Sequence, residues 1–172
     1  PAPGGESIEL TDRERLREQL SDVWREWVKV DSQWFLTTTS AKRTHPESLV
    51  KRHRKNMGWL CRQLYGNNWR KKPELPQWML GVERHKSGNP HSHSVITFPD
   101  MADVTTQLRK EAEHFFSIGG FVQLSMTNSP EWARNYVLKY VLKEGYREAE
   151  IYFSDNFDPI GYRQSVIAGA GR

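Results

Sequence analysis

Two extended segments joined by a short turn restrict the fold of this chain more than any other feature of its sequence. Residues 78–85 and 91–98 carry apolar and β-branched side chains between polar boundaries, a pattern typical of strands. The residues between them read Lys-Ser-Gly-Asn-Pro, and glycine, asparagine and proline are the residues of tight turns. The two segments therefore predict an antiparallel hairpin.

A strand and a helix precede this hairpin, and a helix and a strand follow it. Residues 34–39 are aromatic and β-branched, which favours a strand, and a Thr-x-x-Glu capping box opens a helix over residues 44–66. After the hairpin, a helical pattern runs from just beyond Asp100 to about Ser117, and residues 121–127 alternate as a strand. This order predicts an α+β fold of the ferredoxin-like split β-α-β type, an antiparallel sheet with helices on one face.

The whole chain is predicted to be a single domain, with additions at both ends of this core. A Pro/Gly-rich lead-in at residues 1–7 precedes an amphipathic N-terminal helix within residues 8–31. The core occupies residues 32–145 and ends in a further helix that carries two tyrosines. Residues 146–172 form a C-terminal extension.

Composition narrows the functional classes. The charged fraction is 27% and no apolar run has the length of a membrane span, so we expect a soluble protein. The net charge of +4 is compatible with a polyanionic partner. The chain begins with Pro1 and shows no secretory leader, so we expect an unsecreted domain cut from a longer protein. Its one cysteine excludes an intrachain disulfide. No phosphate-binding Gly-x-x-x-x-Gly-Lys-Ser/Thr motif occurs, so any helicase activity must lie outside these residues.

The hairpin carries the candidate metal ligands. Side chains alternate faces in a strand, so His91 and His93 point the same way, with Cα atoms about 6.5 to 7 Å apart, while Ser92 faces the other side. Glu83 lies on the partner strand, where an antiparallel ladder can bring it opposite a residue beyond the turn, and His85 is the reserve ligand on the same face. A carboxylate with two imidazoles and open positions suits Mn²⁺ or Mg²⁺. The other histidines lie in helical segments without evident partners: His45, His53 and His114.

A helix that opens at residues 129–131 carries the candidate nucleophiles. Tyr136, Lys139, Tyr140 and Lys143 form one polar stripe, because they are spaced three and four residues apart. The two phenols lie about 6 Å apart along the axis, so both could reach one phosphate in turn. Nearby ammonium groups favour the phenolate, which makes the lysines supporting catalytic residues. The opposite side of this predicted helix is aliphatic and is expected to pack against the core. It consists of Val137, Leu138, Val141 and Leu142.

Basic residues scattered along the chain are candidates for binding DNA. A single-stranded substrate requires positive charge along its backbone and aromatic platforms for its bases. Trp69 lies within a basic loop and is the candidate platform. The candidate cations are Lys42, Arg43, Arg52, Arg54, Arg70, Lys71, Lys72, Arg84, Lys86 and Arg134.

These motifs together resemble the HUH endonuclease superfamily, the nicking and joining domains of rolling-circle replication initiators, relaxases and related transposases. Residues 34–39 look like the family's first motif, and the hairpin's acid and histidine pair look like its metal-binding motif. Residues 136–143 look like its nucleophile motif in the two-tyrosine form of microvirus-type initiators and Helitron transposases. Ser92 departs from the family, which usually has a hydrophobic residue at that position.

The resemblance implies site-specific nicking and joining of single-stranded DNA or an extruded origin hairpin, to initiate and terminate rolling-circle replication. It implies that a divalent ion held by Glu83, His91 and His93 polarises the phosphate, and that a tyrosine attacks to give a 5′-phosphotyrosine. We expect Tyr136 to cut first and Tyr140 second. It also implies a helicase domain or host helicase as partner, in the cytoplasm of a bacterial host or the nucleus for a eukaryotic element.

Other interpretations fit parts of the same sequence. His91 and His93 could be ordinary strand histidines beside a solvated carboxylate, and the tyrosines could pack against the sheet. A split β-α-β sheet also serves RNA-recognition modules, which stack bases and catalyse nothing. A transposase would use the same nicking chemistry for strand transfer.

Overall fold

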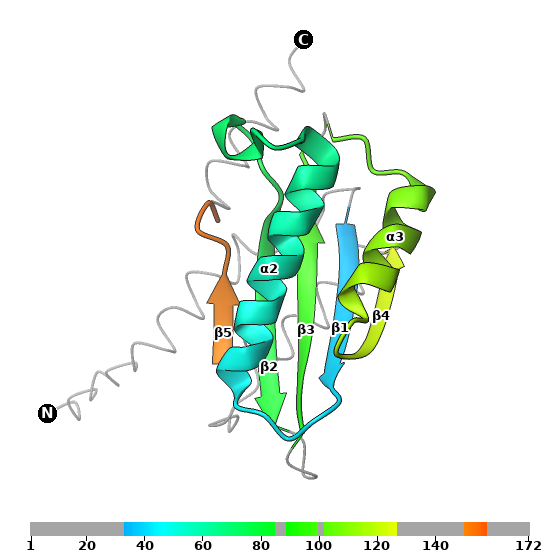
Figure 1. Cartoon of the computed structure of the whole chain (residues 1–172). Coiled ribbons are helices and arrows are strands. Elements are labelled where there is room, and N and C mark those ends of the chain that lie inside the picture. The colour runs from blue at the N-terminus through cyan, green and yellow to red at the C-terminus, as the bar shows by residue number, and fades with distance from the viewer. Residues whose placement is uncertain (1–32, 85–88, 100–101, 127–149, 158–172) are drawn as a thin grey trace, which may run out of the picture.

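The computed structural model describes residues 33–84, 89–99, 102–126 and 150–157 (Figure 1). The predicted N-terminal helix and the predicted tyrosine-bearing helix lie outside these ranges. The predicted site residues outside them are His85, Lys86, Arg134, Tyr136, Lys139, Tyr140 and Lys143.

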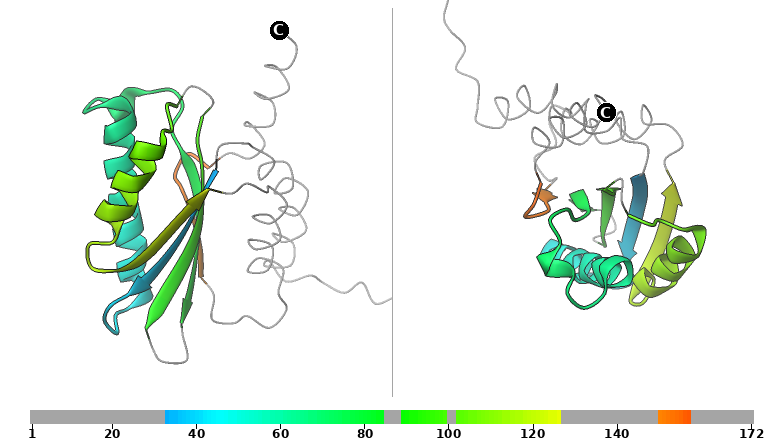
Figure 2. Two further views of the ribbon diagram at one scale, coloured as in Figure 1. Left: turned by 90° about the vertical axis from the view of Figure 1, so that its right-hand side faces the viewer. Right: turned by 90° about the horizontal axis from the view of Figure 1, so that it is seen from above.

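Five strands form one antiparallel sheet in the order β4-β1-β3-β2-β5, and two α-helices accompany it among the described residues. Helices α2 and α3 cover the same face of this sheet (Figure 2). The elements, in chain order, are β1 (Gln33–Ser40), α2 (Pro46–Tyr65), the short 3₁₀ helix η1 (Trp69–Lys71), β2 (Gln77–Arg84), β3 (Pro90–Thr97), α3 (Thr106–Phe116), β4 (Gly120–Met126) and β5 (Glu150–Phe153). The structure confirms the predicted α+β class and the order from β1 to β4.

Helix α2 begins one residue later than the capping box predicted. The Nδ1 atom of His45 accepts a hydrogen bond from the backbone N–H of Glu47, so His45 is the N-cap. Thr44, the predicted cap, instead exchanges a hydrogen bond of 3.2 Å between its hydroxyl and that of Ser40. The helix ends at Gly66, whose φ of 74° favours glycine.

The third predicted helix and the C-terminal extension also differ from expectation. Helix α3 starts at Thr106, several residues beyond Asp100, because the Thr105 side chain accepts a hydrogen bond from the Leu108 backbone N–H and caps it. Strand β5 was not predicted, and it pairs antiparallel with β2. Ser154 anchors this strand: its backbone N–H donates to the Trp78 carbonyl and its hydroxyl accepts from the Trp78 N–H.

The hydrophobic core lies between the sheet and the two helices. Trp34, Leu36 and Ile96 from the sheet are at most 1% exposed, and they belong to one cluster with Leu60 of α2 and Phe116 of α3. Both helices are therefore held by apolar burial on a single sheet face. Among the described residues, no helix has the length and apolar character that a membrane crossing requires.

His53 of α2 lies within this core and has partners that the sequence did not reveal. The histidine is 4% exposed, its Nε2 atom lies 3.3 Å from the hydroxyl oxygen of Ser94, and its ring meets the Trp78 ring edge-on. Burial, together with the positive charge of Arg54, lowers the His53 pKa from 6.5 to about 3. His53 is therefore a neutral core histidine.

Candidate metal centre

Strand alternation puts the predicted ligands on the sheet face opposite the helices. Ser94 contacts His53 of α2, so its neighbour His93 projects from the other face of β3. Ser92 also belongs to the helix side and is 3% exposed, which matches its predicted orientation. The departure from the family pattern at Ser92 therefore concerns core packing and not the ligands.

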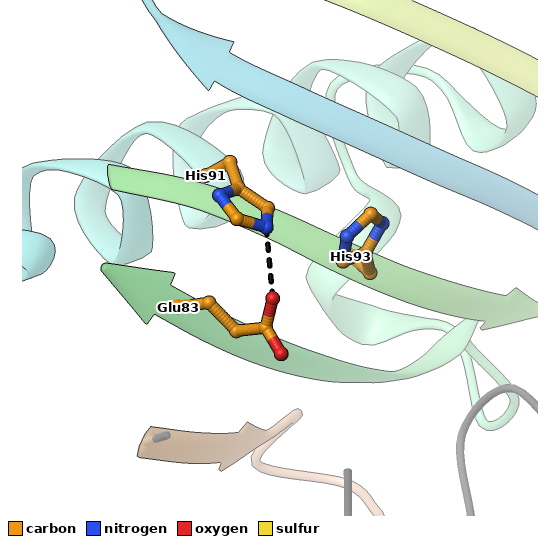
Figure 3. A group of neighbouring side chains, drawn as sticks. All are labelled: Glu83, His91 and His93. Carbon is orange, nitrogen blue, oxygen red and sulfur yellow. Dashed lines mark hydrogen bonds and ion pairs between the residues drawn. The ribbon is translucent and has the colours of Figure 1, made fainter. Parts of the chain in front are cut away.

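Strand pairing brings the acid to the histidines. In the β2–β3 ladder Glu83 is the register partner of His91, and Gly81 is the partner of His93. Glycine has no side chain, so the Glu83 carboxylate can turn toward both imidazoles without obstruction from that position. Figure 3 shows the three side chains converging from the two adjacent strands.

Glu83, His91 and His93 are referred to below as the metal trio. Each contributes one ligand atom, and these atoms lie within 4.8 Å of one another. The Oε2 atom of Glu83 lies 2.8 Å from Nε2 of His91, and the two side chains are only 12% and 17% exposed. Carboxylate oxygen and imidazole nitrogen are both ligands of divalent transition metals, so the trio could hold a metal ion.

His93 is positioned by β1 as well as by its own strand. Its Nδ1 atom lies 3.1 Å from the hydroxyl oxygen of Thr37, its register partner. Its ring stacks on that of Phe35, with centroids 5.7 Å apart and planes at 20°. A hydrogen bond at one ring nitrogen fixes the ring and makes the other nitrogen the ligand atom, the usual arrangement of metal-binding histidines.

Sequence reasoning did not identify Thr37 and Phe35 as neighbours of the site. A signal was present, because residues 34–39 alternate and the split β-α-β order puts β3 beside the first strand. The register between β1 and β3, however, depends on long-range pairing that the sequence pattern does not give.

Two of the predicted DNA-binding residues, Arg52 and Arg54, lie in α2, where Arg52 donates to the Phe116 carbonyl and Arg54 forms an ion pair of 3.3 Å with Asp155. The other described candidates divide between the two ends of the sheet. Lys42 and Arg43 are exposed and follow β1 directly, at the end that carries the metal trio. Arg84 is the last residue of β2, next to Glu83. A second group lies beyond the C-terminus of α2, at the opposite end of β2 from Glu83 (Figure 1), and comprises Trp69, Arg70, Lys71 and Lys72.

This second group is far from the metal trio. Helix α2 has 20 residues and is therefore about 30 Å long, and it separates the two ends. The guanidinium of Arg70 lies 4.5 Å from the centroid of the Trp69 ring, so one face of the predicted platform is already covered. A strand bound at the trio would need to run the length of the sheet to reach these residues.

No family model matches the chain. Comparisons with protein-family models, with curated proteins and with solved structures found no match. Function is therefore inferred from the geometry of the trio and from the sequence motifs around it.

Proposed function

We propose that this protein is an HUH-type endonuclease, which nicks and rejoins single-stranded DNA at a specific site to initiate and terminate rolling-circle replication. The observation that carries the proposal is the metal trio, in which Glu83 and His91 are register partners and His93 lies on the same face. The proposal adds the two tyrosines, predicted from the sequence, as nucleophiles.

The strand order supports the finer fold assignment. Four of the strands follow the order β4-β1-β3-β2, with β3 lying between β1 and β2 and antiparallel to both. This is the arrangement of a split β-α-β unit, so we assign the core to the ferredoxin-like type. Strand β5 extends the sheet beyond β2.

The donor set fits a divalent ion with open coordination positions. Two imidazoles favour Mn²⁺ over Mg²⁺, because Mg²⁺ prefers ligands that are all oxygen. When bound, such an ion polarises a phosphate and stabilises the charge that develops on it. The 2.8 Å contact between Glu83 and His91 brings the two groups together, and a bound cation would replace this contact.

The two tyrosines lie in residues 127–149, outside the described part of the chain. Their approach to the metal trio is therefore part of the proposal and rests on the sequence motif alone.

In the proposed reaction the Tyr136 oxygen attacks the scissile phosphate. A bond from this oxygen to phosphorus forms, the bond to the 3′-oxygen breaks, and the phenolic proton is lost while the 3′-oxygen gains one. Lys139 and Lys143 stabilise the phenolate, and Tyr140 performs the second cleavage. The phosphodiester bond energy is retained in the 5′-phosphotyrosine, so rejoining requires no ATP.

The proposed partners follow from this reaction. The substrate is single-stranded DNA or an extruded origin hairpin, and strand separation falls to a helicase outside residues 1–172. The proposed compartment is the cytoplasm of a bacterial host, or the nucleus for a eukaryotic element.

A covalent-adduct assay tests the proposal. The chain is incubated with a pool of single-stranded oligonucleotides, with and without Mn²⁺, and run on a denaturing gel. We expect a band of protein joined to DNA that disappears with chelator, in His91→Ala/His93→Ala and in Tyr136→Phe/Tyr140→Phe, and that persists in the control His45→Ala/His114→Ala. DNA binding that is equal in chelator and never covalent would contradict the proposal and favour a binding module.

A further inference from the structure

An exposed aromatic residue shares the sheet face of the metal trio. Phe121 of β4 is 66% exposed, whereas its strand neighbours Val122 and Leu124 are buried in the core on the helix side. Alternation therefore directs Phe121 to the other face. An exposed aromatic ring offers a flat face on which a nucleic-acid base can stack.

The ladder connects Phe121 to the trio in a single row. Phe121 pairs with Thr39, Thr39 pairs with His91, and His91 pairs with Glu83. Two strand spacings of about 4.8 Å put the Phe121 backbone about 10 Å from that of His91. A single strand covers this distance in a few nucleotides at most.

The charges around Phe121 suit a polyanion. Gly120, which precedes it, pairs with Ser40, and the Ser40 hydroxyl donates to the carbonyl of Lys42 at 2.8 Å. This contact holds the loop with the exposed cations Lys42 and Arg43 at the same end of the sheet as Phe121. An exposed ring at the same end of the sheet as two exposed cations favours a nucleic acid over a protein partner, whose interface core is depleted of charge.

Among the described residues, the strand neighbours of the ring on the same face are polar. Gln123 is exposed on the same strand face, and Thr39 lies beside Phe121 on β1. An apolar protein interface would require further apolar side chains here, whereas a base needs a single ring to stack on.

We propose that Phe121 is a stacking platform for a base of the single-stranded DNA whose phosphate lies at the metal trio. This inference rests on the proposed function for the identity of the strand. The platform fixes the position of a nucleotide a few steps from the scissile phosphate, and Lys42 and Arg43 hold the backbone beside it.

Binding in the absence of chemistry tests this platform. Fluorescence anisotropy measures the affinity of the full chain for a labelled single-stranded 20-nucleotide DNA in chelator. We expect Phe121→Ala and Phe121→Leu to bind on the order of 5- to 100-fold more weakly, the range of one base–aromatic stack, and Phe121→Trp to bind at least as tightly as the unsubstituted chain.

The matched control is Met126→Ala, which removes another exposed apolar side chain of β4. Met126 is 52% exposed but lies on the opposite side of the strand from Phe121. We therefore expect the Met126→Ala variant to bind the DNA with unchanged affinity. If Phe121→Leu binds as well as the unsubstituted chain, apolar contact and not stacking explains the site, and the platform is refuted. Equal losses in Phe121→Ala and Met126→Ala would refute it as well.

Photo-crosslinking of the unsubstituted chain gives a second measurement. A single strand that contains 5-iodouracil is irradiated with the protein, and the joined peptide is mapped by mass spectrometry. We expect the adduct on Phe121, and adducts confined to other peptides would overturn the platform.

The two proposals can fail separately. Loss of binding in Phe121→Ala without any covalent adduct in Mn²⁺ would retain the platform and overturn the nicking activity. Normal DNA binding by Phe121→Ala, together with a normal covalent adduct, would overturn the platform and retain the nicking activity. A chain that binds no single-stranded DNA would overturn both.

Discussion

Thr37 and Phe35 hold the imidazole of His93 in place. The hydroxyl of Thr37 lies 3.1 Å from Nδ1 of His93, and Phe35 stacks on the same ring. Preorganisation of this kind reduces the entropy that a ligand side chain loses on binding, and it fixes the tautomer. The β1 residues would therefore contribute to metal affinity without touching a bound ion.

We predict that Thr37→Val weakens Mn²⁺ binding about 10- to 100-fold, the usual cost of removing a hydrogen bond to a ligating histidine. Valine preserves the shape and β-branching of threonine, so the strand itself should persist. Isothermal titration calorimetry measures the affinity, and Thr39→Val, the neighbouring threonine on the same face, is the control. An unchanged affinity in Thr37→Val would show that this contact does not orient the ligand.

Burial of His53 makes stability depend on pH. Its pKa is lowered from 6.5 to about 3 in the folded chain, so between these values the unfolded state binds the extra proton. Stability is therefore fully present above about pH 6.5 and is lost as the pH falls toward 3. The slope from this one group is at most about 1.4 kcal/mol per pH unit.

We predict that His53→Gln flattens this dependence. Glutamine can hydrogen-bond to Ser94 but cannot be protonated, so the variant should lose about 2 to 3 kcal/mol less than the unsubstituted chain between pH 7 and 4.5. Urea unfolding at the two pH values measures the difference. Parallel losses in both proteins would mean that His53 is not the titrating group.

The sequence predicted the metal trio because period-two alternation and a hairpin suffice to bring Glu83 near His91 and His93. The surroundings of the trio could not be predicted in the same way. Thr37 reaches His93 through pairing between residues 56 apart in the chain, and local patterns do not encode such a register.

Gly120 shows how closely two elements of the fold approach each other. A Cβ atom at this position would meet the Thr39 carbonyl oxygen, the Ala41 backbone N at 3.3 Å and Nη1 of Arg52 at 2.9 Å. The first two are backbone atoms, which cannot move away without disturbing the β1–β4 pairing. Gly58, in the middle of α2, has no atom within 4 Å of the same position.

We predict opposite effects of alanine at these two glycines. Gly120→Ala should destabilise the fold by about 1 to 3 kcal/mol through overpacking. Gly58→Ala should stabilise it by up to about 1 kcal/mol through helix propensity. Thermal unfolding followed by circular dichroism compares the two, and a stable Gly120→Ala variant would mean that β1 and β4 can separate at this point.

The elements themselves could be predicted only in part. Strands β1 to β4 and helix α2 followed from periodicity and turn residues, with ends displaced by a few residues. The N-cap moved to His45 because its imidazole reaches the Glu47 N–H, a contact that capping-box rules do not cover. Strand β5 has 4 residues and depends on pairing with β2, so no local signal marks it.

At the scale of the whole molecule, the two faces of the described sheet differ in what they carry. One face packs against α2 and α3 and provides the stability of the fold. The other carries the metal trio and Phe121 in adjacent strands, with Lys42 and Arg43 beyond the end of β1. This arrangement could be predicted as a fold class, whereas the use of the second face depends on which residues share a row across the strands.

Binding of one Mn²⁺ ion by the trio is the central claim. Electron paramagnetic resonance measures free Mn²⁺ directly, because the free ion gives a strong six-line signal that diminishes on binding. We predict that the signal falls until one ion is bound per chain, that His91→Ala/His93→Ala abolishes this decrease, and that His45→Ala/His114→Ala preserves it. A signal that the unsubstituted chain leaves unchanged, or that the trio variant lowers equally, would contradict the account.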